Sequence, residues 1–228
     1  MRIISGTAGG ITIKVPTGDT RPATDQVREA VFSMLGDLVP GARVLDLFAG
    51  SGAYGLEALS RGSTSATFVE QNGKACAVIQ ENLRKCRLPG AEVVKSEALA
   101  HLRRLAARNE PPFDLIFADP PYTKQKGDTD FSRLLLESAE LHQLMAPEGI
   151  LLLECMMTKS APLAIPTWTV LRDRSYGSTR VLLFQPVPTP SNAEISGAAD
   201  LQSPLPPGPG RNAPGSPAQD EKAGRPLE

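Results

Sequence analysis

The sequence is poor in the residues that build disulfide frameworks and metal centres. Its 228 residues include three cysteines and two histidines, and neither type shows the spacing of metal ligands or of paired thiols. We therefore expect no metal site, buried free cysteines and a reducing, cytoplasmic environment. The formal net charge is −1, which excludes a strongly basic surface over the whole molecule. No segment has the pattern of a signal peptide or of a membrane span, so we expect no membrane partner.

The composition divides the chain into three parts. Residues 186–228 contain ten prolines and no aromatic residue, so they have little apolar surface to bury and are predicted to form a disordered tail. Residues 1–42 are predicted to form an extension, with two short strands around a glycine-rich connection and then a helix over 24–38. Thr24 or Asp25 is a suitable cap for that helix. Residues 43–185 remain as the main domain.

The main domain alternates between short apolar runs and amphipathic stretches. This alternation is typical of an α/β fold with a mostly parallel sheet and helices on both faces. Gly149 is predicted to mark the stop before the fifth strand. Two later strands, joined by a segment with turn residues, predict an antiparallel end to the sheet. The predicted strands are 44–48, 66–69, 92–94, 113–118, 150–154, 168–172 and 180–184, and the predicted helices are 54–60, 74–85, 98–108 and 131–144.

A glycine-rich loop follows the first strand of this domain, and ligands of open α/β sheets bind at that position. The loop residues Phe48, Ala49, Gly50, Ser51 and Gly52 let the backbone approach a ligand closely. The letters G-S-G-A-Y-G also match a dinucleotide fingerprint, which keeps a nicotinamide cofactor open. Asp46, inside the strand, would repel a pyrophosphate but suits a cationic ligand, which favours S-adenosyl-L-methionine.

Two acidic residues at the ends of the next strands are candidates for the same ligand. Glu70, with its neighbour Gln71, lies about twenty residues after the glycine-rich loop, the spacing at which acidic residues accept ribose hydroxyls. Glu97, with its neighbour Ala98, is placed to accept an adenine amino group. The alternatives are a solvated strand end for Glu70 and a first-turn helix acid for Glu97.

The sequence Asp119-Pro120-Pro121-Tyr122 follows the fourth predicted strand and so falls at the same edge of the sheet. An exocyclic amine of a nucleobase is a poor nucleophile because its lone pair is delocalised into the ring. The Asp119 carboxylate and the Pro120 carbonyl are suited to accept its two N–H groups and to stabilise the charge that develops on nitrogen. Tyr122 is suited to stack on the base. The alternative is that this segment is only a rigid turn after a strand.

Taken together, the chain resembles the bacterial small-subunit (16S) rRNA guanine-N2 methyltransferase family, its D member. The resemblance covers residues 2 to about 184 and is most specific near the N-terminus. The matching stretches are Arg2-Ile-Ile-Ser-Gly6, Lys14-Val-Pro16, Arg21-Pro22, Thr24-Asp25, Val27-Arg28-Glu29-Ala30, Leu45–Ala53, Gly55–Gly62, Phe68-Val-Glu70, Asp119–Tyr122, Tyr176-Gly177 and Thr179.

The resemblance implies a Rossmann-like class I methyltransferase fold with a seven-stranded sheet. It implies S-adenosyl-L-methionine as the methyl donor and a guanine in 16S rRNA, within the small ribosomal subunit or its assembly intermediate, as the acceptor. It implies that Asp119, Pro120 and Tyr122 hold the guanine, and that the extension helps to close the site. The residues expected to contact RNA are Arg2, Lys14, Arg21, Arg28 and Tyr176, in a protein expected to be a monomer.

Three other functions remain open at this point. A DNA adenine-N6 methyltransferase would share both motifs, although the chain has no room for the extra target-reading domain. A non-catalytic rRNA-binding module could use the same fold, but it would not need both motifs. A nicotinamide-dependent oxidoreductase would leave the Asp-Pro-Pro-Tyr sequence unexplained.

Overall fold

The computed structural model describes residues 1–16, 24–122, 127–156 and 165–188, which all belong to a compact unit spanning Met1–Pro188. Of the predicted tail, only residues 186–188 are described. Arg21 also lies outside the described residues. No helix in this part of the chain is long and apolar enough to cross a membrane.

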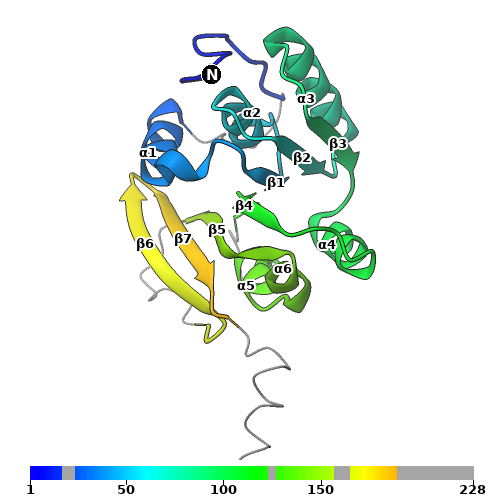
Figure 1. Ribbon diagram of the computed structural model, residues 1–228, viewed down its shortest axis with the longest axis vertical. Helices are drawn as coiled ribbons and strands as arrows, with labels where there is room; N and C mark the ends of the chain where they lie inside the picture. Colours follow the sequence, from blue (N-terminus) through cyan, green and yellow to red (C-terminus); the bar gives the residue numbers. More distant parts are fainter. Residues whose placement is uncertain (17–23, 123–126, 157–164, 189–228) are drawn as a thin grey trace, which may run out of the picture. The chain divides into compact units, whose positions relative to one another are not determined.

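A single seven-stranded sheet organises the described residues, in the strand order β3-β2-β1-β4-β5-β7-β6 (Figure 1). Strands β1 to β5 pair in parallel, and β7 is antiparallel to both β5 and β6. The expected α/β fold with an antiparallel end is therefore confirmed. The strands are β1 (Arg43–Leu47), β2 (Ser65–Glu70), β3 (Ala91–Lys95), β4 (Phe113–Ala118), β5 (Met145–Met156), β6 (Trp168–Tyr176) and β7 (Thr179–Pro186).

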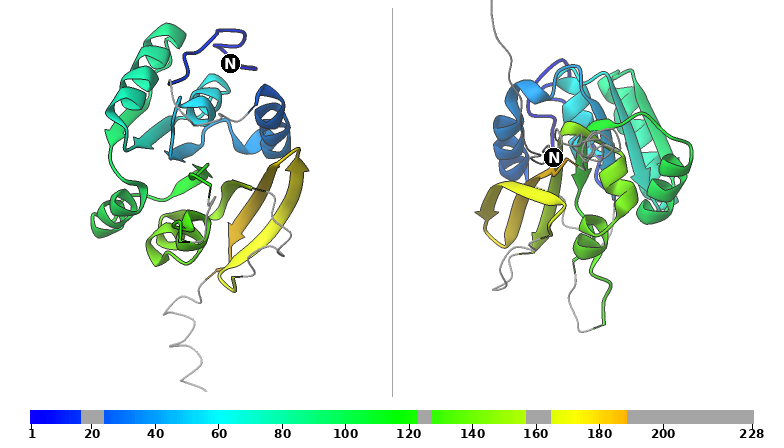
Figure 2. Two further views of the ribbon diagram at one scale, coloured as in Figure 1. Left: turned by 180° about the vertical axis from the view of Figure 1, so that it is seen from behind. Right: turned by 60° about the horizontal axis from the view of Figure 1, so that its bottom comes forward.

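Helices cover both faces of the sheet and form a separate hydrophobic core on each. Helices α1, α2 and α3 pack on one face, and α4, α5 and α6 pack on the other, as the views in Figures 1 and 2 show. Their bounds are α1 (Asp25–Leu35), the 3₁₀ turn η1 (Gly36–Leu38), α2 (Ala53–Ser60), α3 (Gly73–Cys86), α4 (Ala98–Ala107), α5 (Phe131–Leu136) and α6 (Ala139–Gln143).

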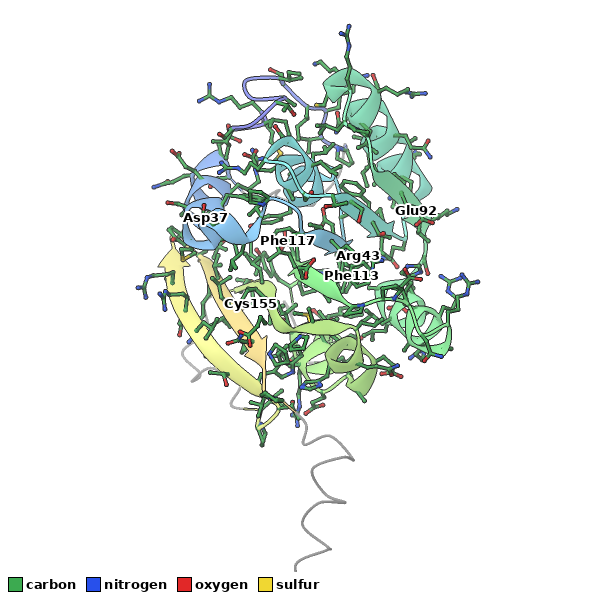
Figure 3. All side chains as sticks on the ribbon, viewed as in Figure 1. Asp37, Arg43, Glu92, Phe113, Phe117 and Cys155 are labelled. Atoms are coloured by element: carbon green, nitrogen blue, oxygen red, sulfur yellow. The ribbon has the colours of Figure 1, made fainter. Side chains whose placement is uncertain are left out.

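The central strand β4 contributes to both cores. Phe117, labelled in Figure 3, stacks on Tyr54 of α2 with ring centroids 5.1 Å apart. Phe113 belongs to the opposite core, because the pairing of β4 with β5 shifts register between Phe113 and Leu115. We predicted that Gly149 precedes the fifth strand, but it lies inside β5 at this irregularity. A Cβ there would come within 3.0 Å of the Phe113 carbonyl oxygen, so the close approach of the two strands requires glycine.

Two further sequence predictions are corrected by local hydrogen bonding. The helix predicted over 131–144 is interrupted, because the Ser138 hydroxyl accepts a hydrogen bond from the Leu141 N–H (3.1 Å) and so caps a new helix, α6. The two strands predicted at the N-terminus reduce to one antiparallel bridge between Arg2 and Thr12.

The N-terminal extension shares the core of the main domain. Ile3 and Ile13 are buried in the same cluster as α1 and α2. The predicted cap of α1 is confirmed, since the Thr24 hydroxyl accepts a hydrogen bond from the Val27 N–H at 3.3 Å. Residues 1–16 are therefore an integral layer over α2 and α3 rather than a separate lobe.

Candidate functional site

A cavity of about 670 Å³ opens at the carboxyl ends of β1, β2, β4 and β5. It contains most of the residues that the sequence predicted for the donor and acceptor sites. Those that line it are Asp46, Phe48, Ala49, Gly50, Ser51, Glu70, Gln71, Glu97, Ala98, Asp119, Pro120 and Tyr122. The fold thus brings the glycine-rich loop (48–52) and the diproline turn (119–122) to one site.

The glycine-rich loop turns sharply after β1. Phe48 has φ 58° and Gly50 has φ 54°, and the Phe48 ring lies edge-on to Phe131 at 5.4 Å between centroids. The predicted role of Gly52 is not supported, because Gly52 does not line the cavity. It caps α2, and a Cβ there would approach Phe68 and Ile79 to 3.2 Å.

The third glycine of the G-S-G-A-Y-G sequence also has a structural role. The Gly55 N–H donates to the Asp46 carboxylate at 3.0 Å, and a Cβ at Gly55 would lie 2.3 Å from the Phe68 ring. Since neither Gly52 nor Gly55 faces the cavity, the resemblance to a dinucleotide fingerprint does not extend to the structure.

Asp46 is a buried carboxyl group, 3% exposed, at the floor of the cavity. Burial raises its pKa from 3.8 to about 8; the hydrogen bond from Gly55 opposes this shift, and the nearby Glu70 charge adds to it. A cationic group in the cavity would favour the charged form of Asp46.

Glu70 and Glu97 are both tied to backbone amides. Glu70 accepts hydrogen bonds from the N–H groups of Gly50 (2.9 Å) and Asn72 (2.7 Å), so it fixes the glycine-rich loop. Glu97 caps α4, accepting from Leu99 (3.0 Å) and Ala100 (2.7 Å). Each carboxylate oxygen has more than one acceptor position, which leaves both side chains able to accept from a ligand as well.

The diproline turn lies beside a second buried carboxyl group, Glu154 at the end of β5. Ala118 pairs with Leu153 in the parallel register, so Asp119 and Glu154 follow at neighbouring positions. The Tyr54 hydroxyl donates to Glu154 at 2.8 Å. Burial raises the pKa of Asp119 well above its usual value, with further increases from the charges of Glu154 and Asp46. Burial also raises the pKa of Glu154, while its bond with Tyr54 acts in the opposite direction.

The charge of the cavity wall is one-sided. Asp46, Glu70, Glu97 and Asp119 line the cavity, and among the described residues lining it none is lysine or arginine. These carboxyl groups fit a ligand that carries positive charge and hydroxyl or amino hydrogen-bond donors, as S-adenosyl-L-methionine does. They disfavour a pyrophosphate, which is negatively charged. In the described ranges, the cavity included, no group of three His, Cys, Asp or Glu side chains is arranged to hold a metal ion.

Comparison with known proteins assigns a family to this arrangement. Residues 1–185 match the family described as Conserved hypothetical protein 95. The chain belongs to this family.

Its relatives confirm the resemblance inferred from the sequence. The chain is 37% identical over 187 residues to "Putative rRNA methyltransferase YlbH" of Bacillus subtilis, covering 81% of this chain and 98% of the relative. It is 33% identical over 186 residues to "Ribosomal RNA small subunit methyltransferase D" of Escherichia coli, covering 81% and 89%. A solved structure, "Putative methyltransferase yhhF from Escherichia coli", superposes with a TM-score of 0.66 at 32% identity, covering 82% of this chain and 97% of that one. The predicted class I methyltransferase fold is therefore confirmed.

The residues predicted to contact RNA differ in their exposure. The side chains of Arg2 and Lys14 are 68% and 61% exposed, and Tyr176 is half-buried at the end of β6, outside the cavity lining. Arg28 is not placed to contact RNA as predicted, because its side chain is fully buried in this structure. It donates to the Arg2 carbonyl (2.5 Å), to Asp25 (2.7 Å) and to buried Glu57 (3.4 Å), and so holds the extension against α2.

Sequence reasoning missed several residues of the site. Val15, Pro16, Tyr54, Met156 and Ser178 also line the cavity, and Glu154 lies behind it. Glu154 closes a predicted strand, so the rule that identified Glu70 could have found it. Val15, Pro16 and Ser178 come from the extension and the β6–β7 turn. The resemblance implied that the extension helps to close the site, but no local sequence pattern identified these three residues.

Proposed function

We propose that this chain transfers a methyl group from S-adenosyl-L-methionine to the exocyclic N2 of a guanine in 16S rRNA. The observation that carries the proposal is the shared cavity, in which an acidic pocket beside the glycine-rich loop adjoins the diproline turn. The names of the relatives support small-subunit rRNA as the acceptor.

The donor end of the cavity would be formed by the glycine-rich loop with Asp46, Glu70 and Glu97. S-adenosyl-L-methionine, when bound, supplies a methyl group attached to a sulfonium centre. The Asp46 carboxylate offsets positive charge at the floor of the cavity, Glu70 accepts ribose hydroxyls, and Glu97 accepts the adenine amino group. These roles are supported by the positions of the three side chains and by the lack of lysine or arginine among the described residues of the lining.

The acceptor end would be formed by the diproline turn. Pro120 and Pro121 have no N–H, so no local amide from these two positions occupies the Asp119 and Pro120 carbonyls. The Asp119 carboxylate and the Pro120 carbonyl accept the two N–H groups of the guanine amine, which orients its lone pair towards the donor end. Stacking on Tyr122 would contribute about 1–3 kcal/mol to base binding.

Asp119 is also suited to receive the proton that the amine loses. Burial and the neighbouring acids raise its pKa, so its carboxylate gains proton affinity over an ordinary aspartate. As the nitrogen becomes positively charged, the ionised form of Asp119 stabilises that charge directly.

For the RNA substrate we propose the assembled small subunit or its assembly intermediate, met by a monomer in the cytoplasm. The exposed side chains of Arg2 and Lys14 are candidates for phosphate contacts. Tyr176 is a candidate for a contact next to Ser178, which lines the cavity. Arg21 is retained as a candidate from the sequence.

The test is methyl transfer from labelled S-adenosyl-L-methionine to small subunits that lack the modification, to protein-free rRNA and to duplex DNA. We expect label in rRNA as N2-methylguanine with the wild type, and at least a hundredfold less with Asp119→Ala, in line with the loss of one charge-stabilising group. Asp37→Ala, an exposed aspartate outside the cavity lining, is the matched control and should retain activity. Label in DNA adenine alone would contradict the proposal.

A further inference from the structure

Asn82 is a buried polar side chain that the proposed reaction does not use. It lies on α3, is 1% exposed and forms three hydrogen bonds, all to backbone groups outside its helix. Its Oδ1 accepts from the Lys14 N–H at 2.8 Å, and its Nδ2 donates to the Lys14 carbonyl at 2.9 Å. Nδ2 also donates to the Ser51 carbonyl at 3.1 Å.

These bonds connect two segments that both reach the cavity. Ser51 belongs to the glycine-rich loop and lines the cavity. Lys14 immediately precedes Val15 and Pro16, which line the same cavity from the extension. One carboxamide group therefore fixes the extension and the loop relative to each other, within a region where the apolar surroundings strengthen each hydrogen bond.

The chemistry of this junction is specific to asparagine. The side chain must present one acceptor and two donors to three backbone groups. An aspartate of the same shape has no donor and would place negative charge against two carbonyl oxygens.

Other contacts at this junction are more exposed. Lys85 donates to the Thr12 carbonyl at 2.5 Å, and Lys14 forms an ion pair with Glu81. Exposed pairs of this kind contribute little, typically below about 1 kcal/mol. The Ser51 hydroxyl also donates to the Met1 Sδ at 3.7 Å, a weak hydrogen bond, so the buried Asn82 bonds are the stronger connection between the extension and the loop.

We propose that Asn82 is a positioning residue for the methyl donor, which holds Val15 and Pro16 as the wall of the cavity facing the glycine-rich loop. The inference rests on the proposed function, because it takes the ligand at that loop to be S-adenosyl-L-methionine. Under this assignment the N-terminal extension is part of the donor site.

The test compares Asn82→Asp with Ser60→Ala. Ser60 is the matched control because it is also 1% exposed and also anchors the extension, accepting from the Ala8 N–H (2.9 Å) and donating to the Ser5 carbonyl (2.5 Å). It does not line the cavity. We would measure donor Kd by titration calorimetry, without RNA, and donor KM and kcat on small subunits.

We expect Asn82→Asp to raise the donor Kd and KM roughly tenfold, while kcat at saturating donor stays within about twofold, because the acceptor end is untouched. Ser60→Ala should leave donor Kd within about twofold, even if both variants lose similar thermal stability. Equal donor Kd in Asn82→Asp and the wild type, or equal losses in both variants, would overturn the inference.

A second variant keeps the test decisive if Asn82→Asp does not fold. Val15→Ala trims the cavity wall itself, where the side chain is half-buried, and should raise donor Kd in the same direction. An unchanged Kd in Val15→Ala would then overturn the inference. Donor binding by the wild type separates the two proposals, since a wild type that does not bind S-adenosyl-L-methionine would refute the proposed function itself.

Discussion

The carboxyl groups of Asp46 and Glu154 lie beneath α2, and each contacts a different residue of that helix. Asp46 accepts from the Gly55 N–H at 3.0 Å, and Glu154 accepts from the Tyr54 hydroxyl at 2.8 Å. Asp119 lines the cavity from the end of β4, the strand that lies between β1, which carries Asp46, and β5, which carries Glu154. All three have pKa values raised chiefly by burial, so each binds its proton more tightly in the folded protein than in the unfolded chain.

This arrangement predicts that stability falls as pH rises. The pKa of Asp46 is about 8 in the folded protein and 3.8 in the unfolded chain, so between these values the folded state binds more protons. One such group lowers the free energy of unfolding by up to about 1.4 kcal/mol per pH unit within that window. Urea unfolding of the ligand-free protein from pH 5 to 8 should show this slope, and Asp46→Asn should reduce it. Parallel pH profiles for the two proteins would refute the prediction.

Arg28 offers a second prediction for a single residue. Its guanidinium group and the Glu57 carboxylate are both fully buried, so Arg28→Ala would leave a buried charge without one of its partners. We expect the free energy of unfolding to fall by about 3–5 kcal/mol. Arg2→Ala, which removes an exposed arginine from the same extension, should change it by less than about 1 kcal/mol. Chemical denaturation of both variants provides the measurement, and comparable losses would show that the buried pair is not a main anchor.

Among the secondary-structure elements, α2 depends on a glycine that sequence analysis had linked to ligand binding. A Cβ at Gly55 would lie 2.3 Å from the fully buried ring of Phe68 on β2. Gly55→Ala should therefore destabilise the protein by about 1–3 kcal/mol through overpacking.

A glycine at the first position of α3 provides the control. At Gly73 the nearest atom to an added Cβ is the flexible end of Lys95, 3.4 Å away, so Gly73→Ala should leave stability unchanged or slightly higher. Thermal unfolding of both variants tests the difference, and equal melting temperatures would contradict this account.

The elements that the sequence predicted well are those with a strong local signal. Apolar runs and capping residues located the strands of the parallel sheet and most helices. The strand ends located Glu70 and Asp119, and the glycine-rich loop drew attention to Asp46 just before it. The break at Ser138 was missed because a serine within an apolar pattern carries only a weak preference for capping. The two N-terminal strands were over-predicted, because the N–H groups of Ile4, Ser5 and Ala8 donate to side chains of α2, Glu57 and Ser60, rather than to a partner strand.

The residues that the sequence did not place are those that depend on packing between distant segments. Val15 and Pro16 directly follow Lys14, which Asn82 of α3 holds through two hydrogen bonds. Arg28 lies in a string that marks the family, yet its burial is set by Glu57, on another helix. Neither relation leaves a periodic pattern in the chain.

At the scale of the whole molecule, the compact unit ends at Pro188 and the family match ends at residue 185. We expect a chain truncated after Pro188 to keep its free energy of unfolding within about 0.5 kcal/mol, as for changes remote from packed features. A chain truncated after Ser178 should not fold, because it lacks β7, which pairs with both β5 and β6. Circular dichroism and urea unfolding distinguish these outcomes, and a large loss on removing residues 189–228 would refute the first.

The one-sided charge of the cavity has a consequence for the lifetime of the protein in a cell. The burial of Asp46 and Asp119 in one cavity opposes folding until a ligand of opposite charge enters, and a bound ligand stabilises the folded state more as its concentration rises above Kd. Proteases act on transiently unfolded chains, so the protein would be degraded faster when its donor is scarce. Its abundance would then follow the supply of the donor without any separate regulator.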